Sequence, residues 1–155
     1  MKKIRVYVDT SVIGGCFDPE FEKWSNVLFK NFEDKILVPL TSAVVEKEIE
    51  FAPAEVQKKF EDFLKLEPEI IQLNQEILEI RNAYLTKAIL KPKFANDLLH
   101  IAIATYANAD VLVSWNFKHI VRFDKILLYN SANIELGYRQ IQIYSPMEVA
   151  RNEKD

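Results

Sequence analysis

The sequence predicts an α/β fold, namely a three-layer α/β/α sandwich around a central, mainly parallel sheet. Short apolar segments typical of buried strands alternate along the chain with longer segments of helical periodicity. Glycine occurs only three times in 155 residues, which argues against an all-β protein with many tight turns. Strands separated by helices favour parallel pairing through right-handed crossovers, with helices on both faces of the sheet.

The first expected strand lies within the stretch Lys2–Ile13, where residues 4–8 are rich in β-branched and aromatic side chains. This strand runs directly into Asp9. If the strand is parallel and central, Asp9 lies at the carboxyl edge of the sheet, where open α/β sheets place their ligand sites.

Further strands and helices follow in alternation. We expect strands at Lys35–Leu40, at Asp110–Ser114 and, at the edge of the sheet, at Gln140–Tyr144. We expect helices after Pro19, over Ala43–Glu50, from Pro53 to Glu67, from an N-cap at Asn74 to Lys91, over Phe94–Ala107, and over Arg122–Leu136. The Phe94–Ala107 helix is apolar on nearly every face and is therefore expected to be buried. In the Arg122–Leu136 helix, the residues expected to face inward are Phe123, Ile126, Leu127 and Ile134.

The length fits one domain over residues 1–150, followed by a charged tail, Arg151–Asp155, that is expected to fray. No apolar run approaches the roughly 20 residues that span a bilayer, and the N-terminus has no signal-peptide pattern. Cys16 is the only cysteine, so an internal disulfide is excluded and a cytoplasmic location is expected. The net charge of −3 means that any contact with nucleic acid requires a local basic patch.

Three acidic residues are predicted to meet at the carboxyl edge. Asp9 ends the first strand, Glu46 follows the second strand, and Asp97 lies in the first turn of the buried helix. Ser114 and Asn116 lie at the end of the Asp110–Ser114 strand. Converging carboxylates repel one another unless a cation lies among them, and oxygen ligands favour Mg²⁺ or Mn²⁺. The pattern therefore predicts metal-assisted hydrolysis of a phosphodiester.

Each of these acids also has a purely structural explanation. Asp9 fits a turn at the end of a strand, Glu46 fits a solvated helix surface, and Asp97 fits a helix N-terminus. Their combination is more informative than any one of them.

Other polar residues are assigned structural or supporting roles. Asp110 begins a strand and so lies at the opposite edge, His100 is expected to be a hydrogen-bonded core residue, and His119 is assigned a surface role with phosphate contact as the alternative. A positive rim that holds an RNA backbone is predicted from four residues: Lys91, Lys93, Lys118 and Arg122. The alternative is that these charges are ordinary solvated surface without a binding role.

The sequence resembles a known family at four segments: YVDTSVI, SAVVEKEI, NDLLHIAIA and ADVLVSWNFKHI. Together they look like a PIN domain, in particular the toxin ribonucleases of VapBC toxin–antitoxin pairs. The resemblance implies a Rossmann-like sandwich, Mg²⁺- or Mn²⁺-dependent endoribonuclease activity, a homodimer and a small antitoxin partner. By position, Asp9, Glu46 and Asp97 match the acidic triad of the family, and Asn116 stands where many members have a further Asp.

The resulting hypothesis is that Asp9 and Asp97 bind the metal, Glu46 holds the ion or orients the attacking water, and Asn116 and Ser114 position that water. The alternative is a catalytically weakened domain that binds RNA or protein, because the amide of Asn116 brings no charge. A phosphatase or phospho-acceptor with Asp9 as nucleophile fits less well, because Ser11 stands where the haloacid-dehalogenase pattern requires a second Asp.

Overall fold

A computed structural model describes residues 2–152 of the chain and contains one sheet within that range. The sheet has five strands, all parallel, in the order β3-β2-β1-β4-β5. The strands are β1 (Arg5–Val8), β2 (Val38–Ser42), β3 (Glu69–Ile71), β4 (Val111–Val113) and β5 (Gln142–Tyr144). The predicted α/β fold with a central parallel sheet is therefore confirmed, and β5 is an edge strand as expected.

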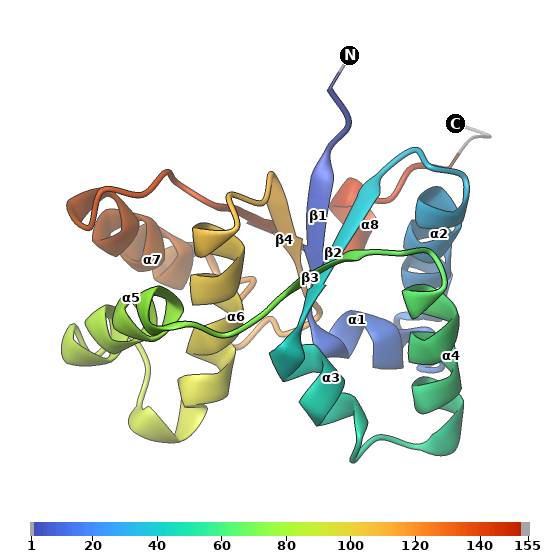
Figure 1. Cartoon of the computed structure of the whole chain (residues 1–155), viewed down its shortest axis with the longest axis horizontal. Coiled ribbons are helices and arrows are strands. Elements are labelled where there is room, and N and C mark those ends of the chain that lie inside the picture. Colours follow the sequence, from blue (N-terminus) through green and yellow to red (C-terminus); the bar gives the residue numbers. More distant parts are fainter. Residues whose placement is uncertain (1, 153–155) are drawn as a thin grey trace.

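Helices cover both faces of the sheet and complete the three layers (Figure 1). One face, on the left in Figure 1, is covered by α5 (Gln75–Thr86), α6 (Ala95–Tyr106) and α7 (Phe123–Glu135). The other face is covered by α1 (Thr10–Gly15), α2 (Glu22–Glu33) and α4 (Ala54–Leu64). The remaining helical elements of the described residues are α3 (Ala43–Ile49) after β2, the 3₁₀ turn η1 (Pro92–Phe94) before α6, and α8 (Pro146–Val149) after β5.

The strand order reverses at β1. The chain builds β1, β2 and β3 toward one side, then returns to place β4 and β5 on the other side of β1. Val8 pairs with Val113, so β1 and β4 end side by side. In open α/β sheets, ligands bind in the crevice outside the carboxyl ends of the strands at such a switch point.

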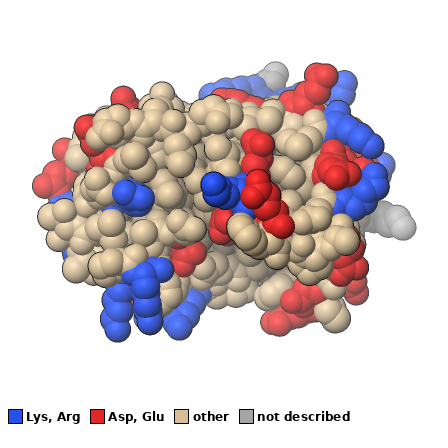
Figure 2. Space-filling model, turned by 60° about the horizontal axis from the view of Figure 1, so that its bottom comes forward, with Lys and Arg blue, Asp and Glu red and all other residues tan. Residues whose placement is uncertain are grey.

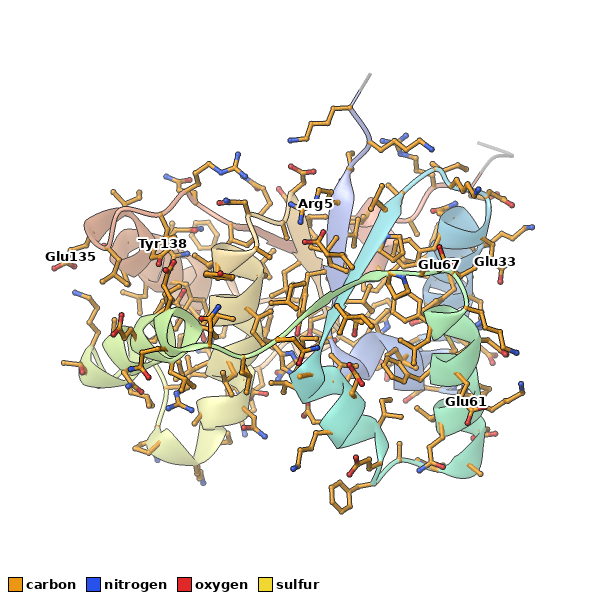
Figure 3. The ribbon with its side chains drawn as sticks, viewed as in Figure 1. Arg5, Glu33, Glu61, Glu67, Glu135 and Tyr138 are labelled. Atoms are coloured by element: carbon orange, nitrogen blue, oxygen red, sulfur yellow. The ribbon has the colours of Figure 1, made fainter. Side chains whose placement is uncertain are left out.

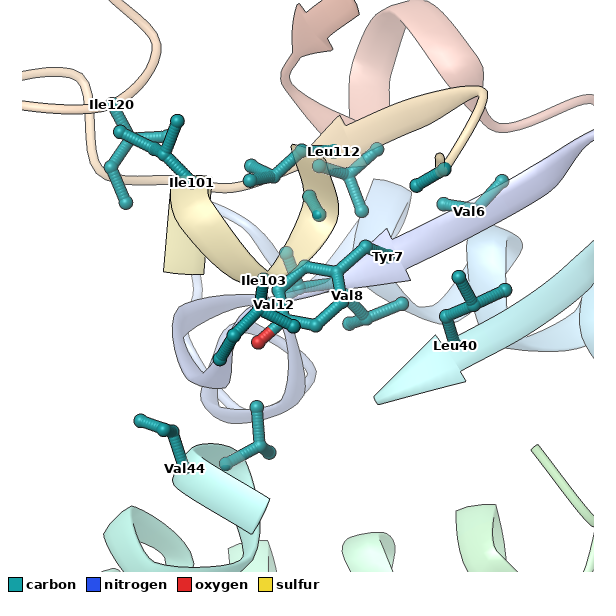
Figure 4. Packing of buried hydrophobic residues seen from close by; sticks show 14 of the residues in the cluster. Val6, Tyr7, Val8, Val12, Leu40, Val44, Ile101, Ile103, Leu112 and Ile120 are labelled. Carbon is teal, nitrogen blue, oxygen red and sulfur yellow. The ribbon is translucent and has the colours of Figure 1, made fainter. Parts of the chain in front are cut away.

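The core is centred on β1 and its neighbours (Figure 4). Tyr7 and Val8 are fully buried and pack with Leu40 of β2 and Leu112 of β4. The middle of α6 is buried from Leu98 to Thr105, which confirms the predicted buried helix. Burial on this scale stabilises the fold by roughly 1.5–3 kcal/mol for each large apolar side chain.

The second strand begins later than the sequence predicts. Lys35 has a φ of 59°, a left-handed conformation that ends the turn after α2. The backbone N–H groups of Ile36 and Leu37 then donate to the carbonyl oxygen of Asn31. These donors close the helix, so the ladder with β1 starts only at Val38. The short strand β3 has no counterpart among the expected elements.

The inward face of α7 differs from the predicted one. Phe123, Leu127 and Ile134 are 79%, 57% and 55% exposed, whereas Tyr129 is fully buried. The Tyr129 hydroxyl donates to the carbonyl oxygen of His119 at 2.8 Å. Of the four residues predicted to face inward, Ile126 is partly buried and packs against the core as expected. The fully buried residues of α7 are instead Tyr129, Ala132 and Asn133, so the predicted face is wrong for the other three.

A separate network of charged groups lies at the amino edge of the sheet and is centred on Arg5. Figure 3 shows Arg5 near the start of β1. The Arg5 guanidinium contacts the Glu69 carboxylate at 2.7 Å. The backbone N–H of Arg5 donates to the Asp110 carboxylate at 2.8 Å. Asp110 therefore lies at the edge opposite the predicted site, as expected.

The described part of the chain ends in contact with α2. The backbone N–H of Arg151 donates to the Asn31 side-chain oxygen at 2.7 Å, and the Asn31 amide donates back to the Arg151 carbonyl at 2.8 Å. Arg151 is therefore anchored, and residues 153–155 of the expected frayed tail lie outside the described residues. Among residues 2–152, no helix is both long enough and apolar enough to span a bilayer.

A buried polar network joins α5, α6 and α7, and its contribution to stability can be tested by substitution. The Tyr84 hydroxyl donates to the Asn133 side-chain oxygen, and the Asn133 amide donates to Thr105 Oγ1 at 3.0 Å. We expect Asn133→Ala to lower the free energy of unfolding in urea by about 1–3 kcal/mol, because it leaves the buried hydroxyls of Tyr84 and Thr105 with only their long 3.5 Å contact to each other. Asn82→Ala, at an exposed position of α5, is the control and should cost under about 0.5 kcal/mol. Equal stability of the two variants would contradict this account of α7.

Candidate active site

Asp9 lies at the switch point between β1 and β4 and is 4% exposed. Its backbone N–H donates to the Val113 carbonyl at 3.3 Å, which continues the pairing of the two strands. Its carboxylate accepts hydrogen bonds from the Ser11 hydroxyl on one oxygen and the Ser114 hydroxyl on the other, each at 2.6 Å. The carboxylate thus joins the start of α1 to the end of β4.

The two serines also hold the loop that follows β4. The backbone N–H of Trp115 donates to Ser11 Oγ at 2.9 Å, and that of Asn116 donates to Ser114 Oγ at 2.9 Å. The side-chain oxygen of Asn116 accepts the backbone N–H of His119 at 3.0 Å. Ser114 therefore orients Asp9, and Asn116 shapes the loop by a local turn.

Asp97 occupies the first turn of α6, as predicted, and is paired with a histidine. Its carboxylate lies 2.7 Å from Nδ1 of His119, which is 9% exposed. The His119 ring also packs against Phe94 with ring centroids 4.0 Å apart. The expected surface role of His119 is therefore replaced by a nearly buried position that orients Asp97.

The third carboxylate of the network is Glu48, which the sequence analysis did not select. Its Oε1 lies 2.7 Å from Nε2 of His100 and accepts the Thr10 hydroxyl at 2.9 Å. Glu46 lies in the same helix, but its side chain makes no hydrogen bond or ion pair with residues 2–152. The structure therefore brings Glu48, and not Glu46, into the network.

The helical positions of α3 explain this difference and give a signal that was present in the sequence. Val44 and Val45 are buried, at 8% and 0% exposure. Glu48 is four residues after Val44 and three after Val45, so it projects from the same side of the helix. Glu46 points roughly 100° away from Val45. A helical-face analysis of Ala43–Glu50 would have favoured Glu48.

His100 lies at the centre of the site and is 3% exposed. Its Nδ1 is 2.8 Å from the Tyr7 hydroxyl, which in turn is 2.8 Å from Ser42 Oγ. Ser42 Oγ accepts the backbone N–H of Val45 and so caps α3. This chain of contacts runs from Glu48 through His100 and Tyr7 to Ser42, and it fixes α3 and α6 against the first two strands. The prediction of a hydrogen-bonded core histidine is confirmed.

Three acids, Asp9, Glu48 and Asp97, influence the pKa of His100. Burial alone would lower the pKa of His100, but its hydrogen bond to Glu48 and the negative charges of Asp9, Glu48 and Asp97 outweigh it and raise the pKa. Burial would raise the pKa of Glu48, yet the hydrogen bond and charge of His100, with the Thr10 hydroxyl, lower it. Burial raises the pKa of Asp9, because the His100 charge and the serine hydroxyls compensate only in part.

The donor set fits a hard divalent cation held partly by water. Within residues 2–152, no group of three or more His, Cys, Asp and Glu side chains stands close enough together to hold a metal ion. Mg²⁺ in proteins, however, commonly uses one or two carboxylates and keeps several waters. Among residues 2–152, both oxygens of buried Asp9 accept side-chain hydrogen bonds from neutral hydroxyls, and the nearby charge of His100 offsets its burial only in part. A cation beside Asp9 would supply the remaining compensation.

The predicted positive rim lines a groove beside the site. The groove has a volume of about 430 Å³ and lies between η1 and the loop before α7. Its cationic lining consists of Lys91, Lys93, Lys118, Arg122 and Lys125, with His119 also in the wall. Figure 2 shows Lys and Arg side chains gathered at the lower left of the face onto which the strands end. The chain thus has a local basic patch despite its net negative charge.

Because Glu48 contacts His100 and Glu46 does not, substitution of these two glutamates should affect the pKa of His100 differently. Glu48→Gln should lower the pKa of His100, followed by NMR of its ring protons, whereas Glu46→Gln should leave it unchanged. Because the folded-state pKa of His100 is raised, its contribution to stability is complete below the unfolded value of about 6.5 and is lost as pH rises through the folded value. Glu48→Gln should reduce this loss of stability with rising pH. A response to Glu46→Gln alone would restore the sequence-based choice.

Comparisons with known proteins match at the level of structure. No family model and no curated protein matches the sequence. The crystal structure of VapBC2 from Rickettsia felis, bound to a DNA fragment from their promoter, matches with a TM-score of 0.58 at 18% identity, over 92% of this chain and 98% of that chain. VapBC-1 from nontypeable Haemophilus influenzae matches with a TM-score of 0.57 at 15% identity, over 93% and 99% of the two chains. FitAcB from Neisseria gonorrhoeae matches with a TM-score of 0.56 at 14% identity, over 92% and 98%. The chain therefore shares the fold of a chain in these VapBC and FitAcB structures, and the predicted PIN-domain fold is confirmed.

Proposed function

We propose that this protein is a metal-dependent endoribonuclease that hydrolyses RNA phosphodiester bonds, and that it is the toxin of a type II toxin–antitoxin pair. One observation carries the proposal: Asp9, Glu48 and Asp97 all lie close enough to His100 to raise its pKa, at the carboxyl edge of a parallel sheet. The fold shared with VapBC and FitAB complexes supports the same function.

A Mg²⁺ or Mn²⁺ ion would be held by Asp9 and Asp97, with Glu48 taking the role that the sequence analysis gave to Glu46. When bound, such an ion supplies a more acidic water and balances the charge that develops on the phosphate. The remaining contributions come from the residues of the chain itself.

Orientation of the carboxylates is the principal task of the surrounding side chains. Ser11 and Ser114 hold both oxygens of Asp9. His100 and His119 hold Glu48 and Asp97 at 2.7 Å each. Partners of this kind fix the direction in which a ligand presents its lone pairs, and their loss typically weakens metal affinity 10- to 100-fold.

The substrate and partners follow from the surface beside the site. The basic groove offers Lys and Arg side chains that can hold phosphates of an RNA strand. The similar structures are VapBC and FitAB assemblies, two of them bound to DNA fragments. We therefore include a small antitoxin in the proposal, and we add the homodimer that the family resemblance implies.

A second candidate is an RNA- or protein-binding module with little activity. Asn116 favours it, because its amide carries no charge and its oxygen accepts the His119 backbone N–H. The two functions differ in whether the chain takes up metal and cleaves RNA.

Cleavage of single-stranded RNA in the presence of Mn²⁺ tests the catalytic proposal. Asp9→Asn should reduce the rate at least 100-fold, since it removes the buried negative charge at the centre of the site. The matched control is Asp110→Asn, which changes an aspartate at the opposite edge and should cleave like wild type. Equal rates for wild type and Asp9→Asn would remove the catalytic claim.

Isothermal titration calorimetry with Mn²⁺ tests metal binding without reference to activity. We expect wild type to bind Mn²⁺ at millimolar concentration or below, and Glu48→Gln to weaken that binding about 10-fold. Glu46→Gln serves as the control on the same helix and should bind like wild type. No heat of binding for wild type would favour the binding module.

A further inference from the structure

An aromatic cluster lies beside the candidate site, and neither the core nor the acidic network accounts for its exposed member. Phe117, in the loop after β4, is 49% exposed. Its ring centroid lies 6.1 Å from that of Trp115 and 6.4 Å from that of Phe21. Phe21 and Trp115 themselves stack with centroids 4.4 Å apart and an interplanar angle of 18°. Phe117 is thus an exposed ring that packs against two other aromatic rings.

The supporting rings are held in place. The indole N–H of Trp115 donates to Ser25 Oγ at 2.8 Å, and Ser25 Oγ donates to the Val12 carbonyl at 2.8 Å. Gly15 permits the close approach, because a Cβ there would lie 2.7 Å from the indole nitrogen. The cluster therefore presents Phe117 on a support that is rigid before any ligand arrives.

The same loop is tied to the candidate catalytic carboxylate. Ser114 donates to Asp9 at 2.6 Å, and Trp115 donates its backbone N–H to Ser11 at 2.9 Å. Three residues of extended chain span at most about 10 Å, so the Cα of Phe117 lies within that distance of the Cα of Ser114. An RNA strand with a phosphate at Asp9 would have an adjacent base within reach of the ring.

The loop that carries Phe117 also reaches the basic groove. Lys118 follows Phe117 directly, and Lys118 and Arg122 line the groove. A cationic track next to an exposed aromatic ring is the combination by which proteins hold single-stranded nucleic acid: charges follow the backbone and bases stack on the rings. Bases of a duplex are already stacked on one another and are not available for this contact.

We propose that Phe117, supported by Trp115 and Phe21, is a stacking surface for one unpaired nucleobase next to the phosphate that is cleaved. The RNA substrate is therefore single-stranded at that nucleotide, in a loop, bulge or end. This inference rests on the proposed RNA substrate, and it adds the residue that selects unpaired over paired RNA.

Binding is measured by fluorescence anisotropy of a labelled single-stranded RNA in EDTA, where metal-dependent cleavage is suppressed. Phe117→Ala should weaken affinity about 5- to 100-fold, and Phe117→Tyr should retain the wild-type value, because a phenol ring stacks equally well. The matched control is Phe51→Ala, an 85% exposed phenylalanine at the end of α3, which should have no effect. Affinity for duplex RNA of the same sequence should not respond to Phe117→Ala.

Stacking itself is read from an RNA that carries 2-aminopurine, whose emission falls when the base stacks. Wild type should quench the probe at one nucleotide position, and Phe117→Ala should abolish the quenching. Unchanged affinity and quenching in Phe117→Ala would overturn the inference, as would an equal loss of affinity for duplex RNA. Because these measurements need no cleavage, an inactive but Phe117-dependent RNA binder would refute the nuclease proposal alone.

Discussion

A buried carboxylate that bridges the ends of two adjacent strands is the constraint on which the rest of this structure depends. Removing an aspartate from water costs several kcal/mol unless its oxygens are hydrogen-bonded. The hydroxyls of Ser11 and Ser114 supply those bonds, one from the start of α1 and one from the end of β4. Asp9 can be buried only where β1 and β4 lie side by side, so the switch point and the site are one feature of the fold.

The other two carboxylates are stabilised in a different way. Glu48 and Asp97 each face a histidine at 2.7 Å, and each histidine is anchored by further contacts within the core. Every acid of the site therefore has its own partner, which limits the repulsion among these partly buried carboxylates. The same partners determine the direction in which each carboxylate faces, so stability and the preorganisation of the site have a common origin.

Three kinds of side chain surround the end of the sheet, and each has a separate physical task. The acids concentrate negative charge at the switch point, and the cations of the adjoining groove balance the field for a polyanion. Phe117 adds an exposed apolar surface, to which we assign contact with a base and not with charge. In the proposed nuclease, this division would let a chain with a net charge of −3 approach RNA.

The sequence by itself determined the layers of the fold and the edge of the sheet at which the candidate site lies. Parallel pairing follows from strands separated by helices, and it places Asp9 and Asp97 at one edge without knowledge of any contact. Only the tertiary structure decided which glutamate of α3 joins them, because Glu46 and Glu48 differ by a rotation about the helix axis that packing fixes. The inward face of α7 was decided in the same way, by the hydrogen bond of Tyr129 that no hydrophobic pattern records. Periodicity specifies that an amphipathic element exists, whereas its rotation depends on partners that are distant in the chain.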